Sequence, residues 1–437
     1  MSKQNKMGTV IRAACGNFLE LYDYLVYIYF ASYIARAFFP TRSQFVSLML
    51  ALGTYGVASF ARPFGAVILG SYMDRAGRRK GLLLTLSLMA VGTVSVAVTP
   101  GYSSIGLLAP LIITAGRLVQ GFSLGVEAGG VNVYLAEIAT PQTRGFYCSW
   151  QAASQALGVI AATGLGVLLT ALLTPEQMSN WGWRVPLLVG CAIVPVLFWL
   201  LRSLPETEVF EHSAHARSTA EILRILAAHW PLLVGAGVMT ILNTTAFYFV
   251  NGYTPTYGSS ALHLAPLGNF EVALVVAITT FVLLPVFGTA SDRFGRWPIL
   301  LGSAILVVAT AYPALSWLVA APGFGRLLAV ESWLAVLYAA YAGALVPLVA
   351  EVLPQKVRSS GYAVILSVTN GIFGSFTPAI ATLLIQATGN RASPALWLSA
   401  AAAVSLTAAL SLWRVVPKTK LAVAIATKRT AATPTDA

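Results

Sequence analysis

The chain has 437 residues, of which 57% are hydrophobic and 10% are charged, and its mean hydropathy is +0.76. Soluble domains carry about 25% charged residues, so this composition excludes an ordinary water-soluble protein and indicates a membrane protein. The formal net charge of +12 would suit a nucleic-acid-binding protein, but the distribution of the basic residues argues against that class.

Apolar stretches long enough to cross a bilayer as helices recur along the whole chain. Helix is the expected state, because backbone exposed to lipid must satisfy its hydrogen bonds within its own segment. The predicted spans, in chain order, are 12–39, 44–70, 81–99, 106–137, 146–173, 183–203, 229–257, 269–289, 298–320, 327–350, 359–387 and 393–413. The sequence therefore predicts an all-α membrane protein with twelve transmembrane helices, six in each half.

A nine-residue phrase occurs twice, half a chain length apart. Gly70–Arg78 and Gly288–Arg296 both read G-x-x-x-D-R-x-G-R. Two further pairs keep nearly the same separation: Glu137…Arg144 with Glu351…Arg358, and Arg202–Thr207 with Arg414–Thr419. Three pairs in the same order indicate a duplicated unit. Internal repeats of membrane segments are typical of secondary transporters.

The repeat predicts two pseudo-symmetric six-helix bundles, at 1–203 and 229–416. The polar stretch 204–228 would link them, and 417–437 would form a disordered tail. Most of the 27 Lys and Arg residues lie at the termini, in this linker, or in loops on the same side of the layout. The positive-inside rule then places both termini and the linker in the cytoplasm. The excess charge orients the protein, so no nucleic-acid partner is expected.

Charged residues inside the predicted spans are few, and such residues are costly and usually functional. They are Glu20, Asp23, Arg62, Arg117, Glu127 and Glu331. Arg62 and Arg117 are deep cations that each need an anionic partner. Either Asp23 and Glu20 neutralise them permanently, or a substrate anion and a proton take turns as the partner. We favour the second interpretation, because a fixed buried ion pair rarely stabilises a protein more than apolar residues do.

The first span carries one polar stripe. Asn17, Glu20, Asp23 and Tyr27 share a face of a largely apolar helix. A carboxylate beside an arginine stays ionised, whereas in dry surroundings it takes up a proton once the arginine turns to a substrate carboxylate. The pattern predicts substrate binding by Asn17 together with Arg62 and Arg117. It predicts proton coupling by Asp23, Glu20 and Glu127.

Neutral hydrogen-bonding groups gather in two spans of the second half. Tyr248, Asn251, Tyr253 and Tyr257 surround Pro255, and a proline loosens the local helical hydrogen-bond ladder. Asn370 lies shortly before Pro378 in the eleventh span. A single membrane tyrosine carries little information, because tyrosines are common at membrane interfaces. The cluster facing two arginines, however, suits a ligand rich in carboxylate and hydroxyl groups.

The repeated phrases fall on loops between adjacent spans. We expect their acids to bond neighbouring helix ends and their basic residues to hold neighbouring carboxylates, forming a latch that favours one conformation. The predicted latch residues are Gly70, Asp74, Arg75, Gly77, Arg78, Glu137 and Arg144 in the first half and Asp292, Arg293, Arg296, Glu351 and Arg358 in the second.

Signals for catalysis or metal binding are weak. Cys15, Cys148 and Cys191 lack paired or metal-like spacing, which indicates small core residues. Gly121–Gly125 matches the G-x-S-x-G motif of hydrolases, but that motif needs a strand-to-helix elbow and a histidine partner. Here it lies within a predicted helix. We therefore expect no enzyme, no catalytic residue, no metal site and no cofactor.

The chain resembles the major facilitator superfamily in its two G-x-x-x-D-R-x-G-R loops and in Gly116–Gly121. Further segments resemble the metabolite–proton symporters: Gly16–Tyr24, Phe38–Pro40, Arg62–Gly65, Gly121–Glu127 and Trp181–Pro186. Within that group, Val131–Pro141, Gly145–Gln151, Tyr253–Gly258 and Phe373–Ile380 are most similar to citrate and tricarballylate permeases. The resemblance covers residues from about 9 to 415.

This resemblance implies two bundles around a central cavity, alternating access, and proton-coupled import of a tricarboxylate anion across a bacterial inner membrane. It implies a monomer in a lipid bilayer, with H⁺ as the coupling ion. By similarity, Asp23 would pair with Arg117 as the protonation switch. Alternatives are a symporter for a dicarboxylate such as 2-oxoglutarate or for shikimate, and a non-transporting membrane sensor.

The chain departs from the family pattern at three places. Trp297 follows Arg296 where a second basic residue is usual, so the second latch is expected to be weaker. Leu21 stands where many members carry an aromatic residue. Glu331 matches no acid of the family pattern. Of two interpretations for Glu331, a proton site or a side chain that reaches the outer interface, we favour the second.

Overall fold

The computed structural model describes residues 18, 21–65, 68–69, 72, 78–125, 135, 139–140, 142–202, 224, 227–354 and 358–430. These residues form helices joined by short turns, with no β-strand among them. Most of the predicted linker 204–228 lies outside the described residues, as do Asn17, Glu20, Glu127, Glu137 and the first latch loop from Gly70 to Gly77.

The helices of the first half follow the predicted spans. The described helices of this half are α2 (Ala31–Phe38), α3 (Gln44–Phe60), α5 (Arg78–Val98), α6 (Tyr102–Ile105), α7 (Leu108–Ser123), α9 (Arg144–Leu172), α10 (Pro175–Asn180), η1 (Gly182–Arg184) and α11 (Val185–Arg202). Residues 21–29 are also helical and lead into α2.

The second half repeats this arrangement with longer helices. They are α14 (Trp230–Phe247), η2 (Tyr248–Tyr253), α15 (Thr254–Ser260), α16 (Pro266–Phe294), α17 (Arg296–Ala320), α18 (Phe324–Val352), α19 (Arg358–Thr369), η3 (Asn370–Gly374), α20 (Thr377–Thr388) and α21 (Pro394–Thr430). A described helix thus overlaps each of the twelve predicted spans. By length and hydropathy, eight of the described helices could cross a membrane, and Leu83–Val98 is a shorter apolar helix.

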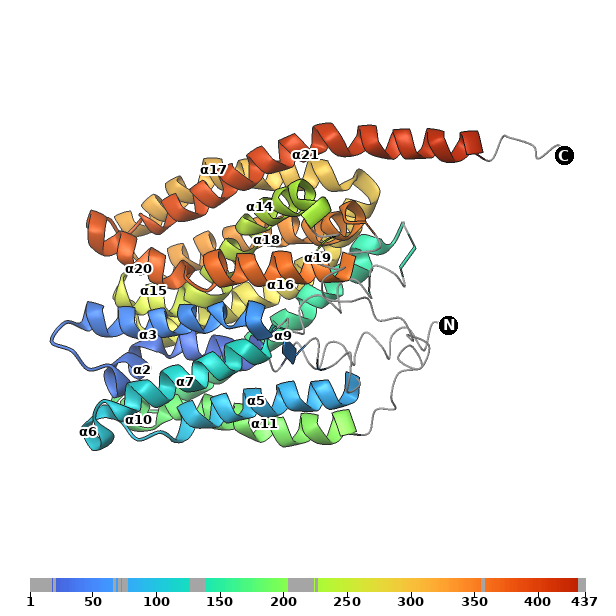
Figure 1. Cartoon of the computed structure of the whole chain (residues 1–437). Coiled ribbons are helices and arrows are strands. Elements are labelled where there is room, and N and C mark those ends of the chain that lie inside the picture. The colour runs from blue at the N-terminus through green and yellow to red at the C-terminus, as the bar shows by residue number, and fades with distance from the viewer. Residues whose placement is uncertain are drawn as a thin grey trace.

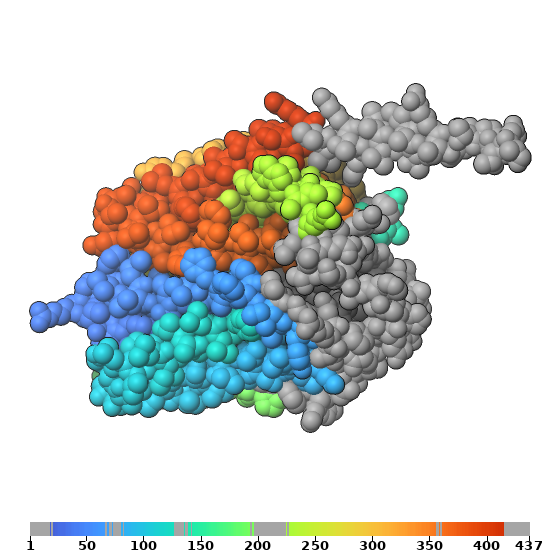
Figure 2. All heavy atoms as spheres, in the orientation of Figure 1, coloured from blue at the N-terminus to red at the C-terminus, as the bar shows by residue number. Residues whose placement is uncertain are grey.

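The helices run roughly along one direction and divide by colour, with α3, α5, α7 and α11 on one side and α14, α17 and α21 on the other (Figure 1). On the face seen in Figure 2, the blue and cyan atoms of the first half meet the orange and red atoms of the second along a continuous seam. The contacts behind this seam include α3 against η3 and α20. On another side, α9 packs along α16 and α18, so it joins the two halves.

Two helices of the second half are interrupted by π-helical turns. Both η2 and η3 are followed closely by a proline, Pro255 in α15 and Pro378 in α20. A proline lacks the N–H that a regular ladder needs, so the preceding backbone widens locally. The wider turns hold Tyr248, Asn251 and Asn370, three of the residues predicted from the sequence to bind substrate.

The helix α21 ends at Thr430 and enters the stretch 417–437 that the sequence predicts to be a disordered tail. In Figure 1 this end of α21 extends beyond the other helices. The stretch from 418 to 430 is rich in alanine and lysine, which favour helix, and this explains the difference.

Candidate functional site

Arg117 is the most deeply buried cation in the described part of the chain. It projects from α7 with none of its surface exposed, and its guanidinium carbon lies 4.0 Å from the centre of the Tyr27 ring. Its Nε, Nη1 and Nη2 atoms have no hydrogen-bond partner among the described residues. The aromatic ring stabilises the positive charge but leaves the N–H donors unused. Arg117 is therefore ready to bind an anion through several hydrogen bonds.

Asp23 lies near this cation without being joined to it. It is 2% exposed, and its Oδ2 accepts a hydrogen bond of 2.5 Å from Nε2 of Gln120, which also donates to Oγ1 of Thr93 at 2.9 Å. Arg117 acts electrostatically on Asp23, but the three ion pairs found among the described residues do not include these two. Oδ1 of Asp23 has no hydrogen-bond partner. Gln120 thus holds the carboxyl group beside the arginine.

Arg62 and a set of tyrosines extend this region. The Arg62 guanidinium carbon lies 4.7 Å from the centre of the Tyr24 ring, and Arg62 is 6% exposed. The Tyr55 ring lies 4.2 Å from that of Tyr24 and 6.1 Å from that of Tyr27. Three tyrosines therefore connect the surroundings of the two arginines. Tyr248, from the second half, meets Tyr55 edge-on with a centroid separation of 6.3 Å.

Hydroxyl groups tie the same region to the second half. The hydroxyl of Tyr24 lies 2.5 Å from that of Ser59 and 2.9 Å from that of Ser375, and the two serine hydroxyls are 2.5 Å apart. Sequence reasoning did not assign Tyr24, Tyr55, Gln120, Ser59 or Ser375. Tyr24, Gln120 and Ser375 do occur inside the family-like segments, which was a usable signal. Tyr55 and Ser59 show no periodicity that distinguishes them from core residues.

Asn251 is the residue of η2 best placed for a ligand. It is 2% exposed, and neither Oδ1 nor Nδ2 of its side chain has a hydrogen-bond partner among the described residues. Its backbone oxygen accepts a hydrogen bond from the Tyr29 hydroxyl, which fixes this turn against the first half. A buried amide without partners is destabilising unless something binds it.

The other predicted residues of the second half fall into two groups. Tyr248 is buried among the tyrosines, and Asn370 is half-buried in η3. By contrast, the Tyr253 hydroxyl bonds that of Thr382 at 2.7 Å, and the Tyr257 hydroxyl donates to the backbone oxygen of Arg391 at 2.7 Å. Both of these side chains belong to the core of the second half. Their hydroxyls are therefore engaged in this conformation.

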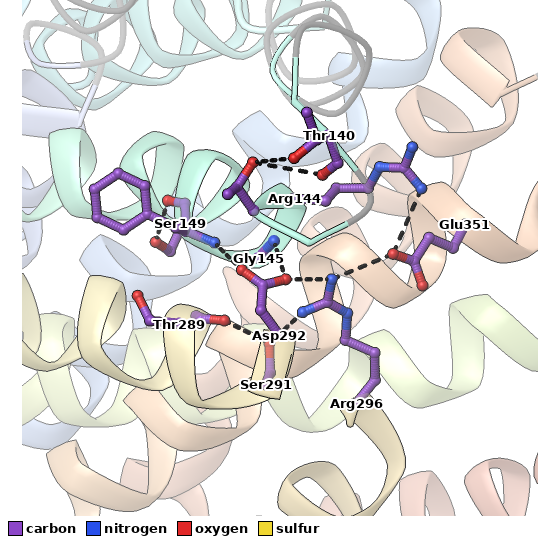
Figure 3. Close-up of polar contacts among 12 residues, drawn as sticks. Thr140, Arg144, Gly145, Ser149, Thr289, Ser291, Asp292, Arg296 and Glu351 are labelled. Carbon is purple, nitrogen blue, oxygen red and sulfur yellow. Dashed lines mark hydrogen bonds and ion pairs between the residues drawn. The ribbon is translucent and has the colours of Figure 1, made fainter. Parts of the chain in front are cut away.

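The second latch phrase lies at a contact between the two halves (Figure 3). The backbone N–H groups of Gly145 and Phe146, at the start of α9, donate to the two carboxylate oxygens of Asp292 at 2.8 and 3.0 Å. The residue before α9, Thr143, supplies no side-chain cap. Asp292 therefore caps a helix of the opposite half, where the helix dipole also favours a negative charge.

Basic residues complete this network. Nη2 of Arg296 lies 2.7 Å from Oδ1 of Asp292 and 3.3 Å from Oε1 of Glu351, and Nη1 of Arg144 lies 3.5 Å from the same Glu351 oxygen. Arg358 instead donates from Nε to the backbone oxygen of Leu353. Arg293 is exposed. Glu351 is thus bonded by one arginine from each half of the chain.

Steric constraints explain why the phrase has glycine at two of its positions. A Cβ atom added to Gly288 or to Gly145 would collide with the carbonyl oxygen of the other residue, so two glycines permit this close approach. Gly295 adopts a φ of +91°, a conformation that other residues rarely accept, at the turn from α16 to α17. Arg296 begins α17, as Arg78 begins α5 in the first copy. The side chain of Arg78 lies outside the described part.

Replacing Asp292 by asparagine is expected to open this contact. Cys148, on α9 beside the network, has no exposed surface, so a thiol reagent reaches it only after opening. Hydrogen bonds to charged groups contribute about 1.5–3 kcal/mol, and a loss of about 1.4 kcal/mol changes a population tenfold. In a chain with Cys15 and Cys191 changed to serine, alkylation of Cys148 should be roughly ten times faster in the Asp292→Asn variant. The control is Arg293→Gln, because Arg293 was predicted to belong to the latch but is exposed and is absent from its ion pairs. It should label at the parental rate; equal rates in all three proteins would contradict the latch.

Glu331 corrects an expectation from the sequence. The sequence favours a side chain that reaches the outer interface, whereas the structure leaves Glu331 only 1% exposed on α18. Neighbouring helices cover this side of α18, and hydropathy along one helix does not reveal which neighbours cover it. Among the described residues, no group of three His, Cys, Asp or Glu side chains is arranged to hold a metal ion.

The apolar helices, the Asp292 contact between the two halves and the buried arginines are those of a multi-pass membrane transporter of the major facilitator type. The chain belongs to the family described as sugar (and other) transporter, whose model matches residues 9–222 and again 208–424. The all-α fold class predicted from the sequence is thereby confirmed, as is membership of the major facilitator superfamily.

Known relatives agree with this assignment. The chain is 45% identical to a citrate-proton symporter of Klebsiella pneumoniae over 97% of this chain and 94% of that one. It is 44% identical to a citrate-proton symporter of Salmonella typhi over 94% and 95% of the two chains. A solved structure of the xylose transporter XylE from E. coli, in a partially occluded inward open conformation, matches with a TM-score of 0.73 at 17% identity. That match covers 93% of this chain and 97% of XylE, and it bears on the fold alone.

Proposed function

We propose that the protein imports citrate, or a related tricarboxylate such as tricarballylate, together with protons by alternating access. The observation that carries the proposal is the guanidinium group of Arg117, which is fully buried with its three nitrogens unbonded beside a buried carboxyl group. A buried cation with free donors favours an anionic ligand. The similarity to two citrate-proton symporters supports the same conclusion.

In the proposed binding mode, one substrate carboxylate takes the free donors of Arg117. A second carboxylate is held by Arg62, next to Tyr24. The side-chain amide of Asn251 provides both a donor and an acceptor for the substrate hydroxyl or the third carboxyl group. Tyr248 and Asn370 complete the second-half side of this site. Asn17 lies outside the described residues and stays a prediction.

Proton coupling in this proposal depends on competition for Arg117. While Arg117 has no ligand, its charge favours the ionised form of Asp23. When a substrate carboxylate neutralises the arginine, Asp23 becomes an isolated buried acid and binds a proton. Because binding free energies are reciprocal, proton binding strengthens substrate binding to the same extent. Glu20 and Glu127 are proposed as further coupling acids, and no cofactor is required.

In this proposal the latch controls access to the site from one side of the membrane. We propose that the Asp292 contact closes one entrance and separates when the site opens to that side. The distribution of basic residues supports a cytoplasmic position for this contact and for both termini, in a bacterial inner membrane. The counterpart loop, with Gly70, Asp74, Arg75, Gly77 and Arg78, is proposed to act in the same way. We propose that the transporter works as a monomer in the lipid bilayer.

Uptake of labelled citrate into proteoliposomes tests the function. We expect accumulation above the external concentration with an inward proton gradient, and equilibration only without one. Unlabelled tricarballylate should compete better than 2-oxoglutarate or shikimate. Shikimate is included as a competitor because the chain is also 30% identical to a shikimate transporter of Escherichia coli. Stronger competition by shikimate would replace the proposed substrate class, and uptake indifferent to the gradient would exclude symport.

The Asn251→Ala variant is expected to bind citrate about tenfold more weakly with little change in maximal rate, because one or two neutral hydrogen bonds contribute about 1–1.5 kcal/mol. The contrasting variant is Tyr253→Phe, whose lost hydroxyl bonds Thr382. It should lower thermal stability and leave the apparent affinity unchanged. Initial rates over a range of citrate concentrations, with melting curves of both purified variants, provide the measurement. A larger affinity loss in Tyr253→Phe than in Asn251→Ala would reverse these assignments.

A further inference from the structure

Glu331 is a buried acid that the proposed cycle leaves unused. It lies on α18 with 1% of its surface exposed, and its Oε2 has no hydrogen-bond partner among the described residues. None of the ion pairs found in the described part of the chain includes it. The cation on its own helix, Arg326, is turned to Trp317, whose backbone oxygen accepts from Nη1 at 2.8 Å.

The neighbours of Glu331 favour a protonated acid. The hydroxyl of Thr254 is its hydrogen-bonding neighbour, and that hydroxyl already donates to the backbone oxygen of Val250 at 2.8 Å. A hydroxyl has a single proton, which Thr254 gives to the backbone oxygen of Val250 here. A protonated Glu331 can donate to the Thr254 oxygen, whereas a carboxylate has to compete with the Val250 oxygen for that one proton.

The titratable neighbour of Glu331 is Tyr257 on α15, and its proton is also engaged, because its hydroxyl donates to the backbone oxygen of Arg391. Arg391 itself is exposed and acts electrostatically on Tyr257. Behind Tyr257, the Tyr253 hydroxyl bonds Thr382. Among the described residues, no cation on α15 or α18 forms an ion pair with Glu331. A buried carboxylate without compensation is too costly and takes up a proton instead.

The position of this acid connects it to the substrate region. Thr254 is the first residue of α15, directly after the π-helical turn η2 that carries Asn251. Glu331 is therefore in contact with the residue that directly follows the proposed substrate-binding turn. Glu351 of the latch lies at the other end of α18, twenty residues further on and roughly 30 Å away at the rise of an α-helix. Glu331 is thus separate from the latch.

We propose that Glu331 is a second proton-binding site, which holds a proton while Thr254 and Tyr257 of α15 lie next to its carboxyl group as seen here. It releases the proton to the other side when these residues move away and water reaches the carboxyl group. One of the protons moved with each substrate would then be carried by Glu331. This inference rests on the proposed symport and adds a second carrier to Asp23.

The test compares Glu331→Gln, which keeps the shape of the side chain and cannot titrate, with the parental protein and with Glu271→Gln. Glu271 is a half-buried acid near the start of α16 and serves as the matched control. In proteoliposomes, proton entry is followed with an internal pH dye while labelled citrate uptake is counted. The expected result is one proton fewer per citrate in Glu331→Gln and an unchanged ratio in Glu271→Gln.

An unchanged ratio in Glu331→Gln would overturn the second site while leaving symport intact. If Glu331→Gln shows no net uptake, the exchange of internal for external citrate is measured without a gradient, to distinguish a proton role from a role in binding or folding. Retained exchange supports the proton role, and loss of exchange with normal thermal stability rejects it. If the parental protein moves no citrate, the proposed substrate fails instead. Infrared difference spectra then test Glu331 alone, because its protonated carbonyl band should be absent only from the Glu331→Gln protein.

Discussion

Replacing Arg117 by alanine is expected to abolish concentrative uptake of citrate. The guanidinium group is fully buried with free N–H donors, so its removal takes away the main partner of a substrate carboxylate. Truncating one member of a buried, hydrogen-bonded charge pair costs about 2–5 kcal/mol. The apparent affinity should therefore fall by at least about 30-fold. Binding of labelled citrate to purified protein, with uptake measured in parallel, checks this result.

The Arg117→Lys variant separates charge from geometry. Lysine keeps the positive charge but lacks the planar fork that binds a carboxylate through two hydrogen bonds. It should therefore bind citrate with an affinity between those of the parental protein and the alanine variant. Thermal unfolding of all three proteins controls for misfolding. Near-normal citrate affinity in a well-folded Arg117→Ala protein would remove this residue from the binding site.

Replacing Asp23 by asparagine is expected to separate substrate movement from proton movement. Asparagine cannot titrate, yet it can still accept a hydrogen bond from Gln120 as the aspartate does. Exchange of internal for external citrate should therefore continue, whereas accumulation driven by a proton gradient should stop. The dependence of uptake on external pH should become flat, because protonation of this carboxyl group no longer assists binding.

Counterflow and gradient-driven uptake in the same proteoliposomes provide the measurement. The neighbouring variant Gln120→Leu serves as the comparison, since it keeps a titrating Asp23 but removes the group that holds it. It should weaken coupling without eliminating it. Full concentrative uptake by Asp23→Asn would show that another acid couples the proton.

Local features of the chain determined the class of protein and much of its layout. Transmembrane helices are encoded by continuous apolar stretches, so a described helix overlaps each span that was predicted without any knowledge of tertiary contacts. Part of the repeated phrase could also be interpreted from local sequence alone. Gly295 and Arg296 lie at the turn from α16 to α17, where spacing in sequence reflects spacing in three dimensions, whereas Gly288 and Asp292 contact α9 of the other half.

Contacts between helices distant in sequence were decided only by the tertiary structure. The sequence contains Asp23, Arg117 and Gln120, but it does not show that Gln120 bonds the acid while the arginine keeps its donors free. The engagement of the Tyr253 and Tyr257 hydroxyls also depends on a neighbouring helix or loop. The burial of Glu331 has the same physical reason. The cost of a charge or a polar group in a membrane protein depends on what covers and contacts it, and those neighbours come from other parts of the chain.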